Sequence, residues 1–236
     1  MYRFTAVVLA AAALFFCGAA SASAAKALNP DEAAGPSAIL VLIPQDPDED
    51  LGFDEQINDG FARIDGLSVG LMSSTQGSYE ASQALLDMSQ GTRVSRSTYD
   101  PKDTPQVLLR KDRILGGGLL ANWVRIVERA DTAPQTIVPG LLASTIPGGA
   151  AYVGTGATLQ KTAIPAADEE GHIAAIDLSD EPDAFGAQPI RAWQFTARYP
   201  FVVFRTKAGR AGLKQLSVLL RLRRPDQVVI ATQSPP

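Results

Sequence analysis

The chain has 236 residues, of which 46% are hydrophobic and 19% are charged, and its formal net charge is −4. This length and composition are typical of one folded domain and exclude a disordered tail, a collagen and a coiled coil. Because the negative charge opposes docking on a phosphate backbone, we do not expect a dedicated nucleic-acid-binding protein.

The N-terminus has the pattern of an export signal. Two positive charges, the amino terminus and Arg3, precede an unbroken apolar run over residues 6–16, and small residues follow as far as Ala24. The run is too short to cross a bilayer of about 30 Å as a helix. We therefore predict a signal peptide over residues 1–24 and a secreted or extracytoplasmic protein with no transmembrane span after cleavage.

Cys17 offers an alternative, because a lipoprotein is anchored through a cysteine at the end of its signal. Phenylalanine occupies the two positions before Cys17, where a lipoprotein signal has small residues, so we favour cleavage after Ala24. Cys17 is the single cysteine of the chain, and cleavage removes it. The mature protein must then fold without disulfides, which requires a hydrophobic core of ordinary size.

From residue 37 onward, strand and helix patterns alternate. Residues 37–43 are a continuous apolar run rich in branched side chains, which is typical of a strand buried on both faces of a parallel sheet. Apolar residues then recur at helical spacing before Gly66. The elements predicted as far as residue 130 are a strand over 37–43, a helix over 54–64, a strand over 67–72, a helix over 79–88, a short strand over 107–109 and a helix over 119–130.

The second half continues the alternation. The predicted elements are a helix over 136–146, strands over 150–154, 173–178 and 201–204, a helix over 213–222 and a last strand over 228–232. Strands that alternate with helices predict an α/β layered fold. We expect a signal peptide over 1–24, a flexible lead-in rich in turn formers over 25–36, and one α/β domain over 37–236.

Two short motifs have ordinary structural interpretations. Asp46, Asp48 and Asp50 alternate like calcium ligands, but Leu51 stands where an EF-hand loop requires glycine, so a solvated acidic loop is favoured. His172 is the single histidine and follows a polar stretch. A zinc site of the usual kind needs more ligands than this one imidazole, and we therefore interpret His172 as a histidine of a surface turn.

Charge is distributed unevenly along the chain. Residues 184–225 contain no acidic residue and nine basic ones, which are Arg191, Arg198, Arg205, Lys207, Arg210, Lys214, Arg221, Arg223 and Arg224. Such a segment can attract an anionic partner, for example phospholipid headgroups or an acidic polymer of the envelope. The alternative is that the segment lies beside the acidic part of the chain and the two charges balance.

Several segments together carry a family resemblance. They are residues 39–51, Val69 to Met72, Gly77 to Tyr79, Gly91 to Arg93, Ala151 to Gly154, and residues 226–236. Read in this order, they resemble the N-terminal half of the alkaline phosphatase superfamily, in particular bacterial secreted or membrane-anchored members of unassigned activity. The resemblance implies a three-layer α/β sandwich with a mostly parallel central sheet, in a truncated form that ends where the family continues.

The resemblance also implies where a metal site and a nucleophile would lie. The family's first metal-binding aspartate ends the first strand, whereas this chain has Pro44 and Gln45 there. Asp46 and Asp48 follow, and they are the candidate metal ligands if the protein is an enzyme. Ser78 is the closest match to the family's nucleophile, near a helix start where the dipole and free amides favour phosphate.

A further departure follows the predicted strand over 201–204. The family tends to have an acidic turn at this point, whereas this chain continues with Arg205 and Lys207, and Arg210 lies three residues after Lys207. These three cations are the candidate anion-binding residues. The later Asp-His and His ligands of the family would lie beyond residue 236, and two-metal hydrolysis needs several such ligands.

These departures predict a secreted, non-catalytic relative with a binding or scaffolding role and no required cofactor. Its exposed last strand would pair with a second protein chain that completes the sheet. Two alternatives stay open. One is a phosphohydrolase or phosphodiesterase that uses Ser78 and a divalent zinc, manganese or magnesium ion held by Asp46 and Asp48. The other is an envelope-associated protein whose basic segment binds anionic lipid or polymer.

Overall fold

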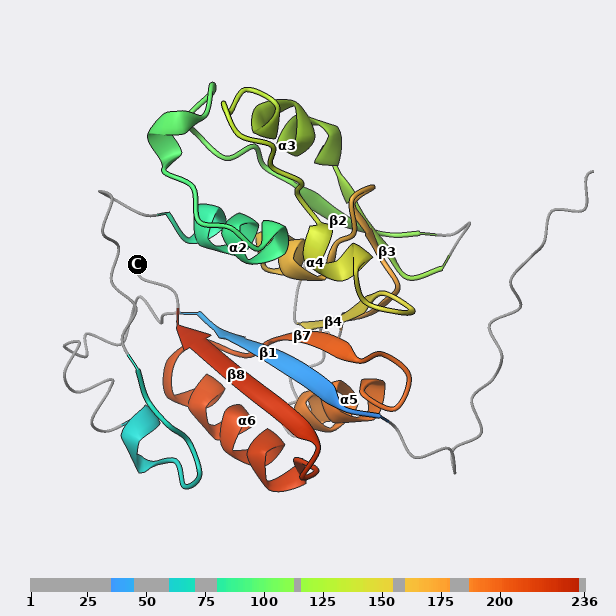
Figure 1. The fold of residues 1–236 in the computed structure, drawn as a ribbon. Coiled ribbons are helices and arrows are strands. Elements are labelled where there is room, and N and C mark those ends of the chain that lie inside the picture. Colours follow the sequence, from blue (N-terminus) through green and yellow to red (C-terminus); the bar gives the residue numbers. More distant parts are fainter. Residues whose placement is uncertain are drawn as a thin grey trace, which may run out of the picture.

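A computed structural model describes residues 35–44, 60–70, 80–112, 116–154, 160–178 and 187–233. The predicted signal peptide, Asp46, Asp48 and Ser78 lie outside these residues, so the predictions made for them stay predictions. The described part is an α/β structure with a parallel sheet at its centre (Figure 1).

Five strands form the central sheet, and every neighbouring pair is parallel. They are β1 (Ser37–Ile43), β4 (Ala150–Gly154), β6 (Ala175–Leu178), β7 (Phe201–Arg205) and β8 (Gln227–Gln233), and their order across the sheet is β6-β4-β7-β1-β8. Leu40 of β1 pairs with Val203 on one side and with Ile230 on the other. The predicted α/β class and mostly parallel sheet are thus confirmed.

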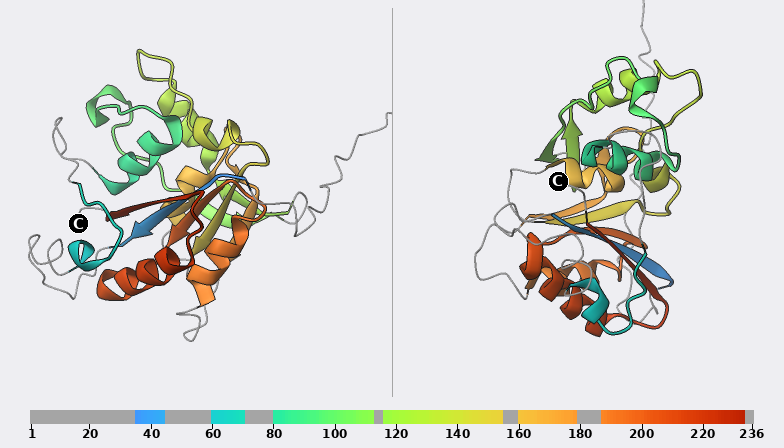
Figure 2. Two further views of the ribbon diagram at one scale, coloured as in Figure 1. Left: turned by 60° about the horizontal axis from the view of Figure 1, so that its bottom comes forward. Right: turned by 90° about the vertical axis from the view of Figure 1, so that its left-hand side faces the viewer.

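Helices cover both faces of this sheet, as the two views in Figure 2 show. The face that we call the α2 face is covered by α2 (Ala81–Gln90), α4 (Leu141–Ser144) and the 3-10 helix η3 (Gln160–Ala166). The opposite face, which we call the α6 face, is covered by α5 (Ala187–Phe195) and α6 (Gly209–Leu222). This arrangement of helices, sheet and helices is that of a three-layer sandwich.

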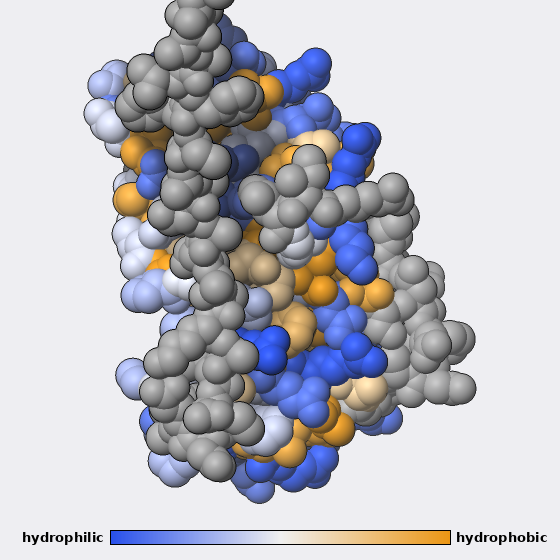
Figure 3. All heavy atoms as spheres, turned by 90° about the vertical axis from the view of Figure 1, so that its right-hand side faces the viewer, coloured by the Kyte–Doolittle hydropathy of each residue, from blue (hydrophilic) through white to orange (hydrophobic). Residues whose placement is uncertain are grey.

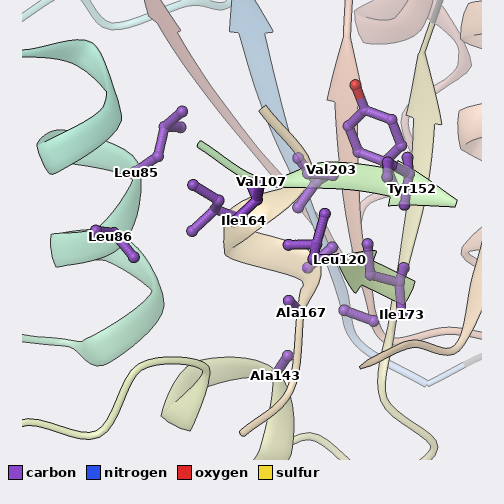
Figure 4. Close-up of a cluster of buried hydrophobic side chains, with 14 of the residues drawn as sticks. Leu85, Leu86, Val107, Leu120, Ala143, Tyr152, Ile164, Ala167, Ile173 and Val203 are labelled. Carbon is purple, nitrogen blue, oxygen red and sulfur yellow. The ribbon is translucent and has the colours of Figure 1, made fainter. Parts of the chain in front are cut away.

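The core lies on both sides of the sheet because side chains alternate along each strand. Leu40, Leu42 and Val203 point to the α2 face, where they join Leu86 and Ile164 in one buried cluster (Figure 4). A second buried cluster on the α6 face consists of Ile39, Val41, Ile43, Ala151, Val153, Ala192, Val202, Phe204, Leu216 and Leu219. Because helices cover both faces, the central strands are apolar throughout, and this is the pattern that made them predictable.

A smaller antiparallel sheet lies beyond the α2 face. It consists of β2 (Leu108–Lys111), β3 (Gly118–Ala121) and β5 (His172–Ile173) in the order β2-β3-β5. The helix α3 (Trp123–Ala130) follows β3, and two short 3-10 helices, η1 (Phe61–Arg63) and η2 (Arg96–Thr98), complete the described elements. None of the described helices combines the length and apolar character needed to cross a membrane.

Five predicted elements are wrong in part. The predicted strand over 173–178 is divided between the end of β5 in the small sheet and β6 in the central sheet. Within the described part of the predicted helix over 54–64, only the 3-10 helix η1 is helical. The predicted helix over 119–130 is the strand β3 followed by α3, because Asn122 takes a left-handed conformation with φ of 67° and separates them. Only the four residues of α4 are helical within the predicted helix over 136–146. Residues 67–70, predicted as the start of a strand, have no regular secondary structure.

Candidate functional site

The connections of the central sheet point to the carboxyl ends of β1 and β7. These two strands are neighbours in the sheet. Along the chain, the next strand of the central sheet after β1 is β4, which lies on the β7 side of the pair. The next strand after β7 is β8, which lies on the β1 side. The helices α2 and α4 follow β1 on the α2 face, whereas α6 follows β7 on the opposite face. In open parallel sheets, ligands bind in the crevice that such a reversal leaves at the carboxyl ends of the strands.

The three predicted anion-binding residues lie at this reversal. Arg205 ends β7, Lys207 lies in the turn that follows, and Arg210 is the second residue of α6. The turn between them is fixed to β1: the Thr206 N–H donates to the Leu42 carbonyl at 3.0 Å. Thr206 is fully buried, so it anchors the turn between Arg205 and Lys207.

The start of α6 contributes backbone donors to the same place. The N-cap residue is Ala208, and among the described residues no side-chain hydrogen bond caps this helix end. The Gly209 N–H donates to the Pro44 carbonyl of the chain leaving β1 at 3.1 Å. Since the first N–H groups of a helix have no acceptor within it, the amides of Arg210 and Ala211 carry the positive end of the helix dipole.

A close approach keeps α6 against the turn. A Cβ atom at Gly212 would lie 2.3 Å from the Lys207 carbonyl oxygen and 2.6 Å from the Thr206 hydroxyl oxygen. Both distances are shorter than any side chain tolerates, so only glycine allows the first turn of α6 to approach the end of β7. The position of the helix dipole relative to Lys207 therefore depends on this glycine.

Two buried glutamines connect the start of α6 to the start of α5. The Lys207 N–H donates to Gln215 Oε1 at 2.8 Å, and Gln215 Nε2 donates to Gln188 Oε1 at 3.0 Å. Gln188 is 1% exposed, and its Nε2 has no hydrogen-bond partner among the described residues. Because the Lys207 amide fixes the orientation of Gln215, it also fixes that of Gln188, whose Nε2 is left as a buried donor beside the two helix ends.

Tyr152 lies on the α2 face beside the end of β7. Its side chain is buried, and its hydroxyl lies 2.7 Å from Thr162 Oγ1. A Cβ atom at Gly154 would lie 2.6 Å from the tyrosine oxygen, so glycine at the end of β4 leaves room for the hydroxyl. Figure 4 shows the ring standing over β4 with its hydroxyl pointing along the strand.

The charge of Arg205 acts on this hydroxyl. Burial raises the pKa of Tyr152, while the Thr162 hydrogen bond and the positive charge of Arg205 oppose the rise. Burial lowers the pKa of Arg205 in turn, and Tyr152 opposes that change. Arg205 is therefore a partly desolvated cation beside a neutral phenol, and a desolvated cation interacts more strongly with an anion than one in bulk water.

The site does not include Arg191, Arg221 or Arg224, three other basic residues of the segment 184–225. Arg191 forms an ion pair with Asp177 at 2.6 Å, and Arg224 forms one with Asp226 at 3.3 Å. Arg221 is in the last turn of α6, at the opposite end from the turn after β7. The segment is thus divided between a cluster at the carboxyl edge and charges spread over α5, α6 and the turn before β8.

The histidine differs from its predicted place. His172 begins β5, and its Nε2 lies 2.8 Å from Asp112 Oδ2, so the prediction of a surface turn is wrong. Among the described residues, no three His, Cys, Asp or Glu side chains lie close enough together to hold a metal ion. The candidate metal ligands Asp46 and Asp48 lie outside these residues.

A second buried polar cluster lies between α2 and α3, away from the sheet edge. Asp87 of α2 accepts hydrogen bonds on one carboxylate oxygen from Gln83 Nε2 and Gln90 Nε2, both at 2.9 Å, and from the Val94 N–H at 3.4 Å. Burial raises the pKa of Asp87 to about 7, although the hydrogen bonds from Val94 and Gln90 and the charges of Arg93 and Arg129 oppose the rise.

Arg129 of α3 is the cation of this second cluster. Its guanidinium lies over the Tyr99 ring at 3.8 Å and donates to Gln83 Oε1 and to the carbonyls of Pro101 and Lys102. Arg129 is 2% exposed, and burial lowers its pKa. Its donors are directed at groups of the protein itself, so this cluster holds α2, α3 and the loop over residues 99–103 together.

Sequence reasoning missed Tyr152, Gln188 and Gln215. Tyr152 lies in an apolar run that the sequence predicts as a strand, and the two glutamines have no spacing that distinguishes them. Comparison of the chain with protein-family models, with curated proteins and with solved structures found no match. The resemblance to the alkaline phosphatase superfamily therefore stays a prediction, and the functional conclusion depends on the geometry at the carboxyl edge.

Proposed function

We propose that this protein binds a phosphate-bearing anion at the carboxyl edge of its central sheet, between β1 and β7. The observation that carries the proposal is the position of Arg205, Lys207 and Arg210, which follow the carboxyl end of β7 and reach into the start of α6, beside a strand whose connection leaves on the opposite face of the sheet. The predicted binding role is kept, and the candidate residues for it are those predicted from the sequence.

The chemistry of the edge suits a phosphoryl group better than a carboxylate. Phosphate offers three or more acceptor oxygens, and the edge offers donors from several directions: guanidinium and ammonium groups, the first amides of α6 and the buried Gln188 Nε2. Each hydrogen bond to a charged group contributes about 1.5–3 kcal/mol. Two or three such contacts correspond to a dissociation constant between about 1 µM and 1 mM.

The test measures binding of inorganic phosphate and of a soluble phosphomonoester by titration calorimetry at low ionic strength. We expect the double variant Lys207→Gln/Arg210→Gln to bind at least about tenfold more weakly, a loss of about 1.4 kcal/mol. The matched control is Arg221→Gln, which removes one exposed cation from the far end of the same helix and should leave the affinity unchanged. Equal affinities of the double variant and the wild type would overturn the proposal.

The same variants distinguish the source of the phosphate. Vesicles that contain an anionic phospholipid are compared with neutral vesicles at low and high salt. Salt-sensitive binding to the anionic vesicles, lost in the double variant, would assign the site to lipid headgroups. Binding of the soluble ester without binding of vesicles would assign it to a free phosphate ester.

The catalytic alternative needs its own measurement. The purified protein is incubated with zinc, manganese or magnesium and with phosphomonoesters and phosphodiesters. Metal-dependent turnover that Ser78→Ala abolishes would replace the binding role by hydrolysis, since an alcohol nucleophile requires a metal or a base to activate it.

A further inference from the structure

The outer edge of β8 has features that its counterpart at the other end of the sheet lacks. Among the described residues, β8 pairs on one side only, with β1, so it forms an edge of the central sheet (Figure 1). It has seven residues, QVVIATQ, with no charge and no proline. The opposite edge, β6, has four residues, and its Asp177 forms an ion pair with Arg191.

Natural edge strands are normally protected by charge, proline, a bulge or short length, because an open edge invites another strand. β8 has neither a charged residue nor a proline, and it is as long as β1. On its α2 face, Val228 and Ile230 are 55% and 53% exposed, although the residues with which they pair in β1, Ala38 and Leu40, lie against the core. An uncharged, seven-residue edge with an open apolar side is a surface for strand addition.

The sequence of β8 is close to symmetric about Ile230. In an antiparallel pair of two copies with a two-fold axis at this residue, Gln227 meets Gln233, Val228 meets Thr232, and Val229 meets Ala231. No like charges face each other. The Gln227 side chain is buried and donates to Thr196 Oγ1 at 2.6 Å, so it adds no side-chain contact to the pairing. A two-fold interface requires this self-complementarity, because each copy contributes the same surface.

The same pairing would cover the exposed apolar side chains. Because strands of one sheet share its faces, Ile230 of one copy would lie beside Ile230 of the other on the α2 face, with Val228 flanking the pair on both sides. On the α6 face, Val229 and Ala231 are already partly buried. On the face of the molecule that Figure 3 shows, apolar and hydrophilic side chains are interspersed.

We infer that β8 is a dimerisation edge at which a second copy of this chain adds its own β8 antiparallel, centred on Ile230, to make a continuous ten-stranded sheet from two five-stranded ones. This inference is independent of the anion site, because Val228 and Ile230 take no part in that site. It specifies the predicted second chain as another copy of this protein and sets the register of the pairing.

The test uses sedimentation equilibrium and light scattering on the purified protein. The wild type should be a dimer. Ile230→Lys and Ile230→Glu should each raise the dimer dissociation constant at least tenfold, because the two-fold axis brings each new charge against its own copy. Since Ile230 is half exposed, both variants should keep the fold, which circular dichroism checks.

Mixing the two variants in equal amounts gives the decisive result. Lysine and glutamate then face each other across the axis, so the mixture should recover the dimer. Val124→Lys, at an apolar position of α3 that is 64% exposed, is the matched control and should leave the wild-type dimer intact. A monomeric wild type, a dimer insensitive to Ile230, a mixture that stays monomeric, or an edge that instead takes up a strand of another protein would overturn the inference.

Discussion

Replacing Asp87 by asparagine changes one buried ionisable group without changing its shape. Asp87 is 8% exposed, and one of its oxygens accepts three hydrogen bonds. Its pKa rises from the ordinary value of 3.8 to about 7 in the folded protein because burial disfavours the carboxylate. Asparagine keeps the acceptor oxygen and has no charge, so it imitates the protonated acid at every pH.

The sign of the effect follows from proton binding. Between about pH 4 and pH 7 the folded protein holds a proton on Asp87 that the unfolded chain has released, so the free energy of unfolding falls as the pH rises through this range. One pKa unit corresponds to 1.36 kcal/mol, and the whole shift therefore to about 4 kcal/mol at most. The hydrogen-bond donors around the carboxylate can reorient when it ionises, so we expect about 1–3 kcal/mol.

The measurement is urea denaturation of the wild type and of Asp87→Asn between about pH 4 and pH 8. The variant should gain about 1–3 kcal/mol relative to the wild type at the upper end of this range and little at the lower end. Glu128→Gln, at an exposed position of α3, is the control for a general change in charge. A difference between Asp87→Asn and the wild type that does not change with pH would refute the reasoning.

Three further substitutions test the packing around the site and the core. Gly212→Ala should destabilise the protein by about 1–3 kcal/mol and weaken phosphate binding, because its methyl group would meet the Lys207 carbonyl, whereas Gly35→Ala, with open space around it, should lower neither the melting temperature nor the affinity. Arg129→Met leaves buried carbonyls without their donors and should cost about 3 kcal/mol in chemical denaturation, most of which would be absent if the cluster were hydrated. Leu216→Ala, at a fully buried position of α6, should cost about 2–5 kcal/mol in a thermal melt, and a smaller loss would mean that the site collapses around the missing atoms.

The local sequence was sufficient to predict an element whose burial follows a simple pattern along the chain. β1, β4 and β7 coincide with predicted strands, because a strand covered on both faces must be apolar at every position. Most of β8 also coincides with a predicted strand, because its residues are rich in branched side chains although one of its faces is half exposed. The helices α2 and α6 were predicted within a few residues, since one apolar stripe repeats along each.

Local sequence failed where pairing with a distant strand decides the conformation. The residues of β3 are apolar and run directly into α3, so the pattern predicts one helix. They form a strand because β2 and β5 pair with them from both sides, and β5 comes from about fifty residues later in the chain. The helix α5 was missed because Pro189 lies inside it and its apolar stripe is weak.

The sequence by itself determined the chemistry of the proposed site but not its surroundings. Arg205, Lys207 and Arg210 could be selected because they are close in sequence, follow a strand and stand in a stretch without acidic residues. Only the tertiary structure decided that Tyr152 and Gln188 lie near them and that the connections reverse at this edge. That proximity depends on the strand order β6-β4-β7-β1-β8. No local pattern encodes this order, because it is set by which helices cover which face of the sheet.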